Sequence, residues 1–131
     1  MENIICIDTD VIIDHLKGKG PGVNAFEEII KSGNPHTTYI NKFELLCGAR
    51  RKKEIKIIET CLLGFRILPF DESGSREAAR IYRELKKQGE LIGVRDIMIA
   101  GIVKANNLIL ATKNIKDFKR IKELRLLEIR N

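Results

Sequence analysis

Residues 4–13 read IICIDTDVII, an apolar run that passes directly into Asp8, Thr9 and Asp10 before the chain turns apolar again. A short, continuous apolar run is typical of a strand that is buried on both faces of a parallel sheet. The two carboxylates therefore come at the very end of a buried strand. One acid in that place can cap the following helix, so their meaning depends on whether other acids reach the same place.

The rest of the chain alternates between strand-like and helix-like segments. Apolar and β-branched segments predict strands at 3–7, 36–40, 65–70, 108–112 and 124–129. Helices are predicted at 9–16, 23–31, 41–63 (one or two helices, with Gly48 as a candidate break), 71–89, 95–106 and 114–121. This alternation predicts a three-layer α/β/α sandwich on a mainly parallel central sheet. We expect residues 1–131 to form a single domain of this class.

Two of the expected helices have distinct patterns. The segment 71–89 is amphipathic, with one apolar face formed by Ala78, Ile81, Tyr82 and Leu85. Its spacing of i, i+3, i+4 and i+7 is that of one helix face, and Gly89 is a typical C-terminal stop. The segment 95–106 is apolar nearly all round, which predicts a helix buried close to the sheet.

Composition narrows the class of protein further. Charged residues make up 32% and hydrophobic residues 44% of the 131, as in ordinary folded proteins. The apolar runs are far shorter than the roughly 20 residues that span a bilayer. The start MENIIC shows neither the basic stretch nor the cleavage site of a signal peptide, so we expect a cytoplasmic protein.

The cysteines, the histidines and the net charge limit the kinds of site and partner that this protein can have. Cys6, Cys47 and Cys61 form no CxxC pair and are expected to be free thiols, with Cys6 and Cys61 in apolar runs. The two histidines, at positions 15 and 36, have no zinc-type spacing. A net charge of +6 favours a polyanionic partner.

Carboxylate and amide side chains recur where predicted strands end or where the next helix begins. They are Asp8 and Asp10 after the first strand, Glu44 on the helix after the second, Asp96 at the start of 95–106, and Asn114 and Asp117 after the fourth. Taken singly, each acid can be explained as a helix cap or a surface residue. In a parallel sheet, however, the carboxyl ends of the strands share one edge. Acids gathered there repel one another, and a divalent cation such as Mg²⁺ or Mn²⁺ relieves that repulsion.

A carboxylate-bound divalent metal is suited to phosphoryl chemistry, because it lowers the pKa of a bound water and offsets charge on the phosphate. Two basic clusters lie near the candidate ligands in sequence. They are Arg50, Arg51, Lys52 and Lys53 beyond Glu44, and Lys113, Lys116, Lys119 and Arg120 around Asp117. Charge runs are usually solvated surface, but beside an acidic pocket they are also suited to steering a phosphodiester backbone.

The sequence resembles a PIN domain, and it closely resembles the small toxins of VapBC-type toxin–antitoxin pairs. The resemblance is carried by ICIDTDVIIDHLKG (5–18), YINKFELLCGARRK (39–52), RDIMIAGIVKANNLILATKNIKDFKRI (95–121) and LRLLEI (124–129). No single block is specific, but four blocks in the family's order and spacing cover nearly the whole chain.

The resemblance implies a metal-dependent endoribonuclease with Mg²⁺ or Mn²⁺ as cofactor, RNA as substrate, a homodimeric assembly and a cognate antitoxin that inhibits it. Carried over, Asp8, Glu44 and Asp96 are metal ligands and catalytic residues. The fourth position belongs to Asp117 or Asn114, with Asp117 preferred as ligand, and Thr9 would support the site by hydrogen bonding.

Three features depart from the family pattern. Asp10 stands where Asn or Ser is more common, and it either adds to the metal site or faces a neighbouring amide. Asn114 stands where many relatives carry the fourth acid, which leaves a second metal position open. The aromatic content of 5% offers few stacking platforms, so RNA recognition would rest on phosphate contacts and shape.

Other classes of protein remain alternatives at the level of sequence. The stretch DTDVI nearly fits the opening of haloacid-dehalogenase-like phosphatases, with Asp8 as nucleophile and Asp10 as general acid. A signalling receiver domain would also gather acids around Mg²⁺, and a degenerate PIN domain would only bind RNA. DNA cleavage is a further alternative, because metal and carboxylates do not read the 2′-hydroxyl.

Overall fold

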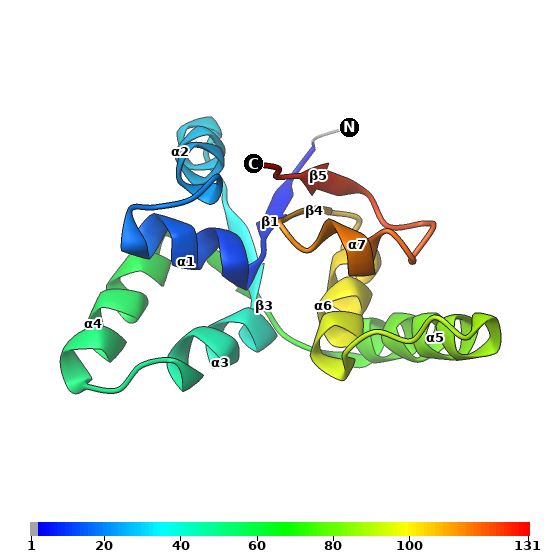
Figure 1. Ribbon diagram of the computed structural model, residues 1–131. Helices are drawn as coiled ribbons and strands as arrows, with labels where there is room; N and C mark the ends of the chain where they lie inside the picture. The colour runs from blue at the N-terminus through cyan, green and yellow to red at the C-terminus, as the bar shows by residue number, and fades with distance from the viewer. Residues whose placement is uncertain (1–2) are drawn as a thin grey trace.

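The computed structural model describes residues 3–131, which fold around one five-stranded sheet (Figure 1). The strands are β1 (Ile5–Ile7), β2 (His36–Thr38), β3 (Arg66–Leu68), β4 (Ile109–Thr112) and β5 (Leu126–Glu128). They lie in the order β3-β2-β1-β4-β5, and every neighbouring pair is parallel. All five predicted strands are present, and the predicted parallel sheet is confirmed.

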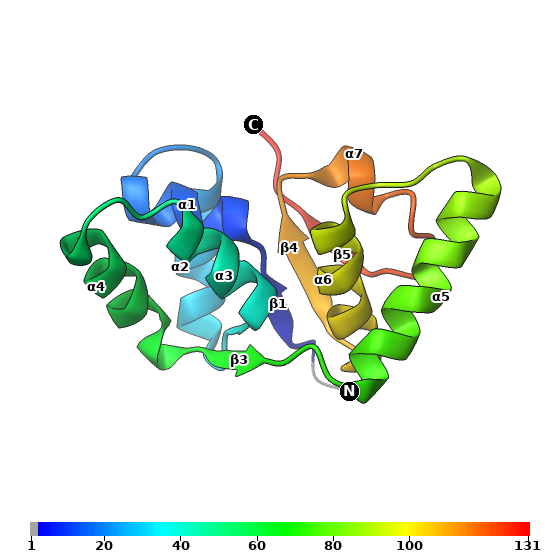
Figure 2. The ribbon, with the colours of Figure 1, turned by 90° about the horizontal axis from the view of Figure 1, so that it is seen from below.

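Helices cover both faces of this sheet. They are α1 (Thr9–Lys17), α2 (Gly22–Ser32), α3 (Tyr39–Cys47), α4 (Lys52–Cys61), α5 (Glu72–Gln88), α6 (Val94–Ala105) and α7 (Ile115–Phe118), with a 3-10 turn at Leu62–Gly64. Figure 2 shows α1 to α4 on one side of the strands and α5 to α7 on the other, which confirms the three-layer sandwich. Within residues 3–131 we find no helix with the length and apolar character that a bilayer crossing requires.

The inner strands β1 and β4 bury both of their faces, as their apolar sequences predict. In β1, Cys6 packs into the core beneath α5 and α6, whereas Ile7 packs into the core beneath α1, α2 and α4. In β4, Leu110 packs into the same core as Cys6, and Ala111 packs into the same core as Ile7. Successive side chains of a strand point to opposite faces, so a continuous apolar run is needed when helices cover both.

The register of the sheet places polar residues together at its carboxyl edge. Ile7 pairs with Ala111, so Asp8 and Thr112 are the next residues on their strands. The chain leaves β1 for β2 on one side and later returns to β4 on the other, which makes the end of β1 a switch point in strand order. Ligand sites of parallel α/β sheets form at such a point.

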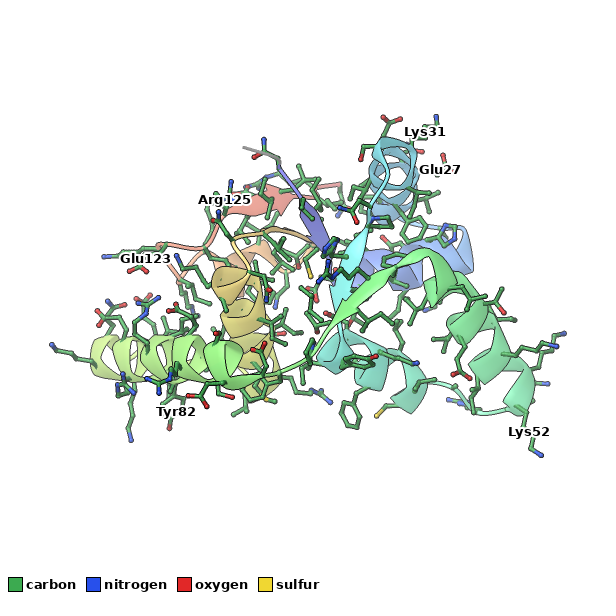
Figure 3. The ribbon with its side chains drawn as sticks, turned by 180° about the vertical axis from the view of Figure 1, so that it is seen from behind. Glu27, Lys31, Lys52, Tyr82, Glu123 and Arg125 are labelled. Atoms are coloured by element: carbon green, nitrogen blue, oxygen red, sulfur yellow. The ribbon has the colours of Figure 1, made fainter. Side chains whose placement is uncertain are left out.

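Two details differ from the predictions, and two others are confirmed. The strand predicted at 36–40 ends at Thr38, because the Thr38 hydroxyl accepts the Asn41 N–H and starts α3 at Tyr39. The candidate break in 41–63 is confirmed, because α3 ends at Cys47 with Gly48 as its C-cap and α4 and a 3-10 turn follow. On α5, Tyr82 is 38% exposed and points away from the core (Figure 3), unlike its three predicted partners, which are buried. The predicted stop is confirmed, since Gly89 ends α5 with a φ of 69°.

The close packing of α5 on α6 depends on one small residue. A Cβ added at Gly101 would lie 2.7 Å from the Ala78 Cβ, the Ala78 nitrogen and the Gly74 carbonyl oxygen. Gly101→Ala should therefore lower the free energy of unfolding by about 1–3 kcal/mol, because backbone atoms must move apart. Urea unfolding measures the difference. Gly64→Ala is the matched control, since nothing lies within 4 Å of its added Cβ. Equal stability of the two variants would contradict this account of the packing.

Candidate metal centre

Asp8 is the buried centre of the carboxyl edge. The residue directly follows β1 and is only 5% exposed. One carboxylate oxygen accepts the Thr9 N–H and the Asn41 Nδ2–H, each at 2.9 Å. The other oxygen accepts the Thr112 hydroxyl at 2.7 Å. The three donors come from parts of the chain that are distant from one another in sequence, and together they satisfy the buried carboxylate.

Glu44 is held beside Asp8 by a chain of hydrogen bonds. The Thr9 hydroxyl donates to Glu44 Oε1 at 2.6 Å and accepts the Asn41 Nδ2–H at 2.9 Å. The other Glu44 oxygen, Oε2, lies 3.2 Å from Arg95 Nε. Glu44 reaches this position because α3 begins directly after β2. Thr9 thus makes the kind of supporting contact that the resemblance implies for it.

Asp96 lies in the first turn of α6 without capping it. The helix is capped by Gly93, with no side-chain bond to the free amides. The Asp96 carboxylate instead accepts the Asn114 Nδ2–H at 3.2 Å, and the same nitrogen donates to Asp117 Oδ2 at 3.3 Å. Asn114 therefore stands between two acids. Both candidates for the fourth ligand position lie next to Asp96.

Asp10 faces a neighbouring amide, one of the two alternatives that the sequence left open. The backbone N–H of Lys113 donates to both Asp10 oxygens, at 3.3 and 3.2 Å. The Lys113 ammonium lies 2.9 Å from Asp14 Oδ2, one turn further along α1. Asp14 also accepts the Gly22 N–H at 2.9 Å. Lys113 thus ties the turn after β4 to one face of α1.

Helices α1 and α3 lie on one side of the carboxyl edge and α6 on the other (Figure 1). An open pocket at this edge gathers side chains from all three helices. Its lining residues are Asp8, Thr9, Asp10, Ile13, Glu44, Cys47, Gly48, Arg95, Asp96 and Asn114. Asp117 is not part of this lining and connects to it through Asn114. The pocket therefore brings together three of the four predicted metal ligands.

The electrostatics of the pocket show that its acids affect one another. Burial, and then the charge of Asp10, raise the pKa of Asp8 to about 7, although Thr112 and the Thr9 amide lower it. Burial, and then the charges of Glu44 and Asp117, raise the pKa of Asp96 to about 6. The donors around these carboxylates therefore do not balance their combined charge, and both protons and cations are attracted to the pocket.

The residues present fit a hard divalent cation by their chemistry. The acids offer carboxylate oxygens, which are the ligands that Mg²⁺ and Mn²⁺ prefer. In the described part of the chain, no three His, Cys, Asp or Glu side chains are already arranged as a metal site. Glu44 is turned toward Arg95 and Thr9, and the Asn114 amide separates two acids. Side-chain rotation is needed, and the ligand set Asp8, Glu44, Asp96 and Asp117 stays a prediction.

Exposed basic side chains follow two of the site segments in the sequence, although none of them lines the pocket. The segment 50–53 is exposed and begins two residues after the pocket residue Gly48. Figure 3 shows Lys52 extending into solvent from the start of α4. Lys116 and Lys119 are exposed on and after α7, beside Asp117. A protein with an acidic pocket and a positive net charge is suited to a polyanion that must be drawn toward a bound cation.

Sequence reasoning missed three residues of this site: Asn41, Thr112 and Arg95. Thr112 is the last residue of a buried strand, the same position that drew attention to Asp8. Asn41 lies three residues after Thr38, a spacing that indicates a helix cap. Its contact with Asp8 depends on the packing of α3 against α1 and has no signal in the sequence. The same is true of the pairing of Arg95 with Glu44.

Fold and pocket together define an α/β protein whose acidic site lies at the switch point of a parallel sheet. The PIN domain family matches residues 5–124. The chain is 34% identical to Ribonuclease VapC1 of Methanocaldococcus jannaschii, over 95% of this chain and 86% of that protein. It is 28% identical to the tRNA(fMet)-specific endonuclease VapC of Shigella flexneri, over 91% and 92% of the two chains. The crystal structure of VapBC2 from Rickettsia felis, bound to a promoter DNA fragment, superposes with a TM-score of 0.84 at 27% identity and covers 95% of this chain and 98% of that chain.

This chain belongs to the PIN domain family. The family match covers nearly the whole described chain and includes every predicted site residue. The resemblance inferred from four short blocks is therefore confirmed. None of the comparisons favours a phosphatase of the haloacid-dehalogenase type or a receiver domain.

The raised pKa of Asp8 predicts how pH affects the stability of the metal-free protein. The folded-state pKa of about 7 exceeds the ordinary value, so the folded chain binds the proton more tightly than the unfolded chain. The free energy of unfolding should therefore fall as pH rises from about 4, the ordinary pKa of an aspartate, and level off above the folded-state pKa. At about 1.4 kcal/mol per pKa unit, the decline is on the order of 2–4 kcal/mol.

Asp8→Asn should flatten this dependence, because the amide does not titrate. Urea unfolding in EDTA, repeated across this pH range, measures it. Asp71→Asn is the control, since Asp71 is an exposed cap of α5 and asparagine also caps helices. A slope in Asp8→Asn as steep as that of the unsubstituted protein would show that Asp8 does not carry the effect.

Proposed function

We propose that this protein is a divalent-metal-dependent endoribonuclease and the toxin of a VapBC-type toxin–antitoxin pair. The observation that carries the proposal is the pocket itself, in which acids from α1, α3 and α6 meet at the switch point of the sheet. Relatives named as VapC ribonucleases match the chain over most of its length. Mg²⁺ or Mn²⁺ is the proposed cofactor, with Asp8, Glu44, Asp96 and Asp117 as ligands.

When bound, such an ion supplies Lewis acidity, which lowers the pKa of a water molecule and offsets the charge that builds on a phosphodiester. The protein's own hydrogen bonds position the acids. Thr9 and Asn41 fix the orientation of Glu44 and Asp8, and Thr112 holds the second oxygen of Asp8. Asn114 keeps Asp96 and Asp117 within reach of one another. These bonds keep the acids close together before substrate arrives, so that rotation of side chains is enough to bring them onto a metal ion.

The net charge of +6 and the exposed basic side chains that follow Glu44 and flank Asp117 in the sequence give the proposal its substrate class. A phosphodiester backbone is attracted by Lys and Arg regardless of sequence. Aromatic residues are few, at 5% of the chain, so contacts with phosphates and with RNA shape are the expected means of recognition. A PIN domain that only binds RNA is disfavoured, because the pocket retains Asp8, Glu44 and Asp96 together.

Two protein partners belong to the proposal, a cognate antitoxin and a second copy of the chain. The antitoxin follows from the likeness to VapBC structures such as that from Rickettsia felis. A homodimer is supported by large apolar side chains left exposed on the contacting helices α3 and α6 and in the loop between α5 and α6: Tyr39, Phe43, Leu91 and Val94. We place the protein in the cytoplasm, where its three free cysteines would stay reduced.

Removing a ligand charge should abolish cleavage while preserving the fold. Glu44→Gln and Asp96→Asn keep side-chain size, and each should lower the rate of RNA cleavage by about two orders of magnitude or more, because charge stabilisation in the transition state is lost. Initial rates on labelled RNA in Mg²⁺ or Mn²⁺ measure this. Glu72→Gln is the matched control, since Glu72 pairs with Arg76 in solvent on α5.

The same assay separates the alternatives for the reaction. RNA, DNA and a small phosphomonoester are offered separately to the purified protein, with metal or with EDTA. RNA cleavage that depends on metal supports the proposal, whereas hydrolysis of the phosphomonoester alone would favour a phosphatase. Full activity of Asp96→Asn, or undiminished activity in EDTA, would contradict metal catalysis at this site.

The homodimer can be tested through its proposed contact surface. Phe43 is 53% exposed although it is aromatic and lies beside the pocket residue Glu44. Phe43→Glu should convert the dimer to monomer in sedimentation velocity, because a charge cannot be buried without a partner. Leu63→Glu changes an apolar residue that is 82% exposed and lies outside this surface, and it should leave the dimer intact. Sedimentation of the unsubstituted protein as a monomer would contradict the proposed homodimer.

A further inference from the structure

Arg95 occupies a position that the proposed reaction does not explain. It lies in the first turn of α6, directly before Asp96, and lines the acidic pocket. Its Nε lies 3.2 Å from Glu44 Oε2. The other Glu44 oxygen already accepts the Thr9 hydroxyl. A cation of the chain itself therefore holds one of the carboxylates that a divalent metal would use.

The contact between Arg95 and Glu44 is easily exchanged. The Arg95 side chain is 58% exposed, whereas that of Glu44 is 18% exposed. Ion pairs with one partner in solvent contribute little to stability, typically below about 1 kcal/mol. Within residues 3–131, Glu44 is the only ion-pair or hydrogen-bond partner of this guanidinium. Most of its donors therefore face solvent at the mouth of the pocket.

Two kinds of ligand would act on Arg95 in opposite ways. A divalent cation that binds Glu44 repels the guanidinium, because both are positive and share one carboxylate. A phosphodiester that enters the pocket attracts it, because the planar fork of arginine matches two phosphate oxygens. Arg95 is also the cation that lowers the pKa of Asp96. Its charge is thus felt inside the pocket, although the side chain lies at the rim.

We propose that Arg95 is a phosphate-binding residue that holds Glu44 in the metal-free protein and turns to the RNA backbone when a divalent cation takes Glu44. The inference rests on the proposed nuclease function and adds a role for one residue. With such an exchange, bound metal would raise the affinity for RNA and bound RNA the affinity for metal, because each ligand separates Arg95 from Glu44. If Arg95 only supported Glu44, its removal would instead weaken metal binding.

The test measures Mn²⁺ affinity of the RNA-free protein by titration calorimetry and, separately, KM and kcat for RNA at saturating Mn²⁺. Arg95→Gln should bind Mn²⁺ about two- to fivefold more tightly, the range expected for loss of a weak competing ion pair. Its KM for RNA should rise by a similar factor while kcat changes little. Arg95→Lys keeps the charge and should lie between the two proteins.

Arg76→Gln is the matched control. Arg76 forms an exposed ion pair with Glu72 on α5, outside the pocket, and carries the same charge. Neither Mn²⁺ affinity nor KM should change in this variant. Thermal unfolding shows that each variant is folded.

Mn²⁺ affinity that is unchanged or weaker in Arg95→Gln would overturn the exchange, and so would an unchanged KM. These outcomes leave the nuclease proposal standing, because the unsubstituted protein still binds Mn²⁺ and cleaves RNA. Absence of Mn²⁺ binding and of cleavage in the unsubstituted protein would overturn the proposed function and this inference with it.

Discussion

The burial of Asp8 at the end of the central strand is the constraint on which the rest of the site depends. A carboxylate removed from water must find donors or take up a proton. The fold brings three donors to it: the amide of the next residue, the hydroxyl of Thr112 and the side chain of Asn41. Each donor belongs to a different part of the chain. Satisfying one acid therefore fixes how β4 and the start of α3 lie against the end of β1.

Donors do not remove the repulsion between neighbouring acids. The pKa values of Asp8 and Asp96 are both raised, first by burial and then by the charges of other carboxylates. The chain offsets part of this negative charge with its own cations, since Lys113 pairs with Asp14 and Arg95 with Glu44. A proton, a divalent metal and an internal arginine are thus alternative ways to neutralise one cluster. This competition links the stability of the protein to its chemistry.

The pocket is also the place where the two helical layers of the molecule meet. Asp8 and Glu44 come from the layer that contains α1 to α4, whereas Asp96 comes from the layer that contains α5 and α6 (Figure 2). The sheet lies between the two layers, and α3 and α6 also contact each other directly. A parallel sheet of short strands with both faces covered keeps its carboxyl edge in one plane, so acids from both layers reach the same pocket.

The sequence by itself determined the parallel α/β architecture, because strands buried on both faces and amphipathic helices leave periodic patterns that do not depend on distant contacts. It also indicated which acids follow the strands, since the end of a strand is marked locally. Only the tertiary structure decided that β2 stops at Thr38 and that Tyr82 faces solvent. The contacts of Asn41 with Asp8 and of Arg95 with Glu44 were likewise decided there. These contacts join residues more than 30 positions apart across helix packing, and no local pattern in a sequence specifies such distances.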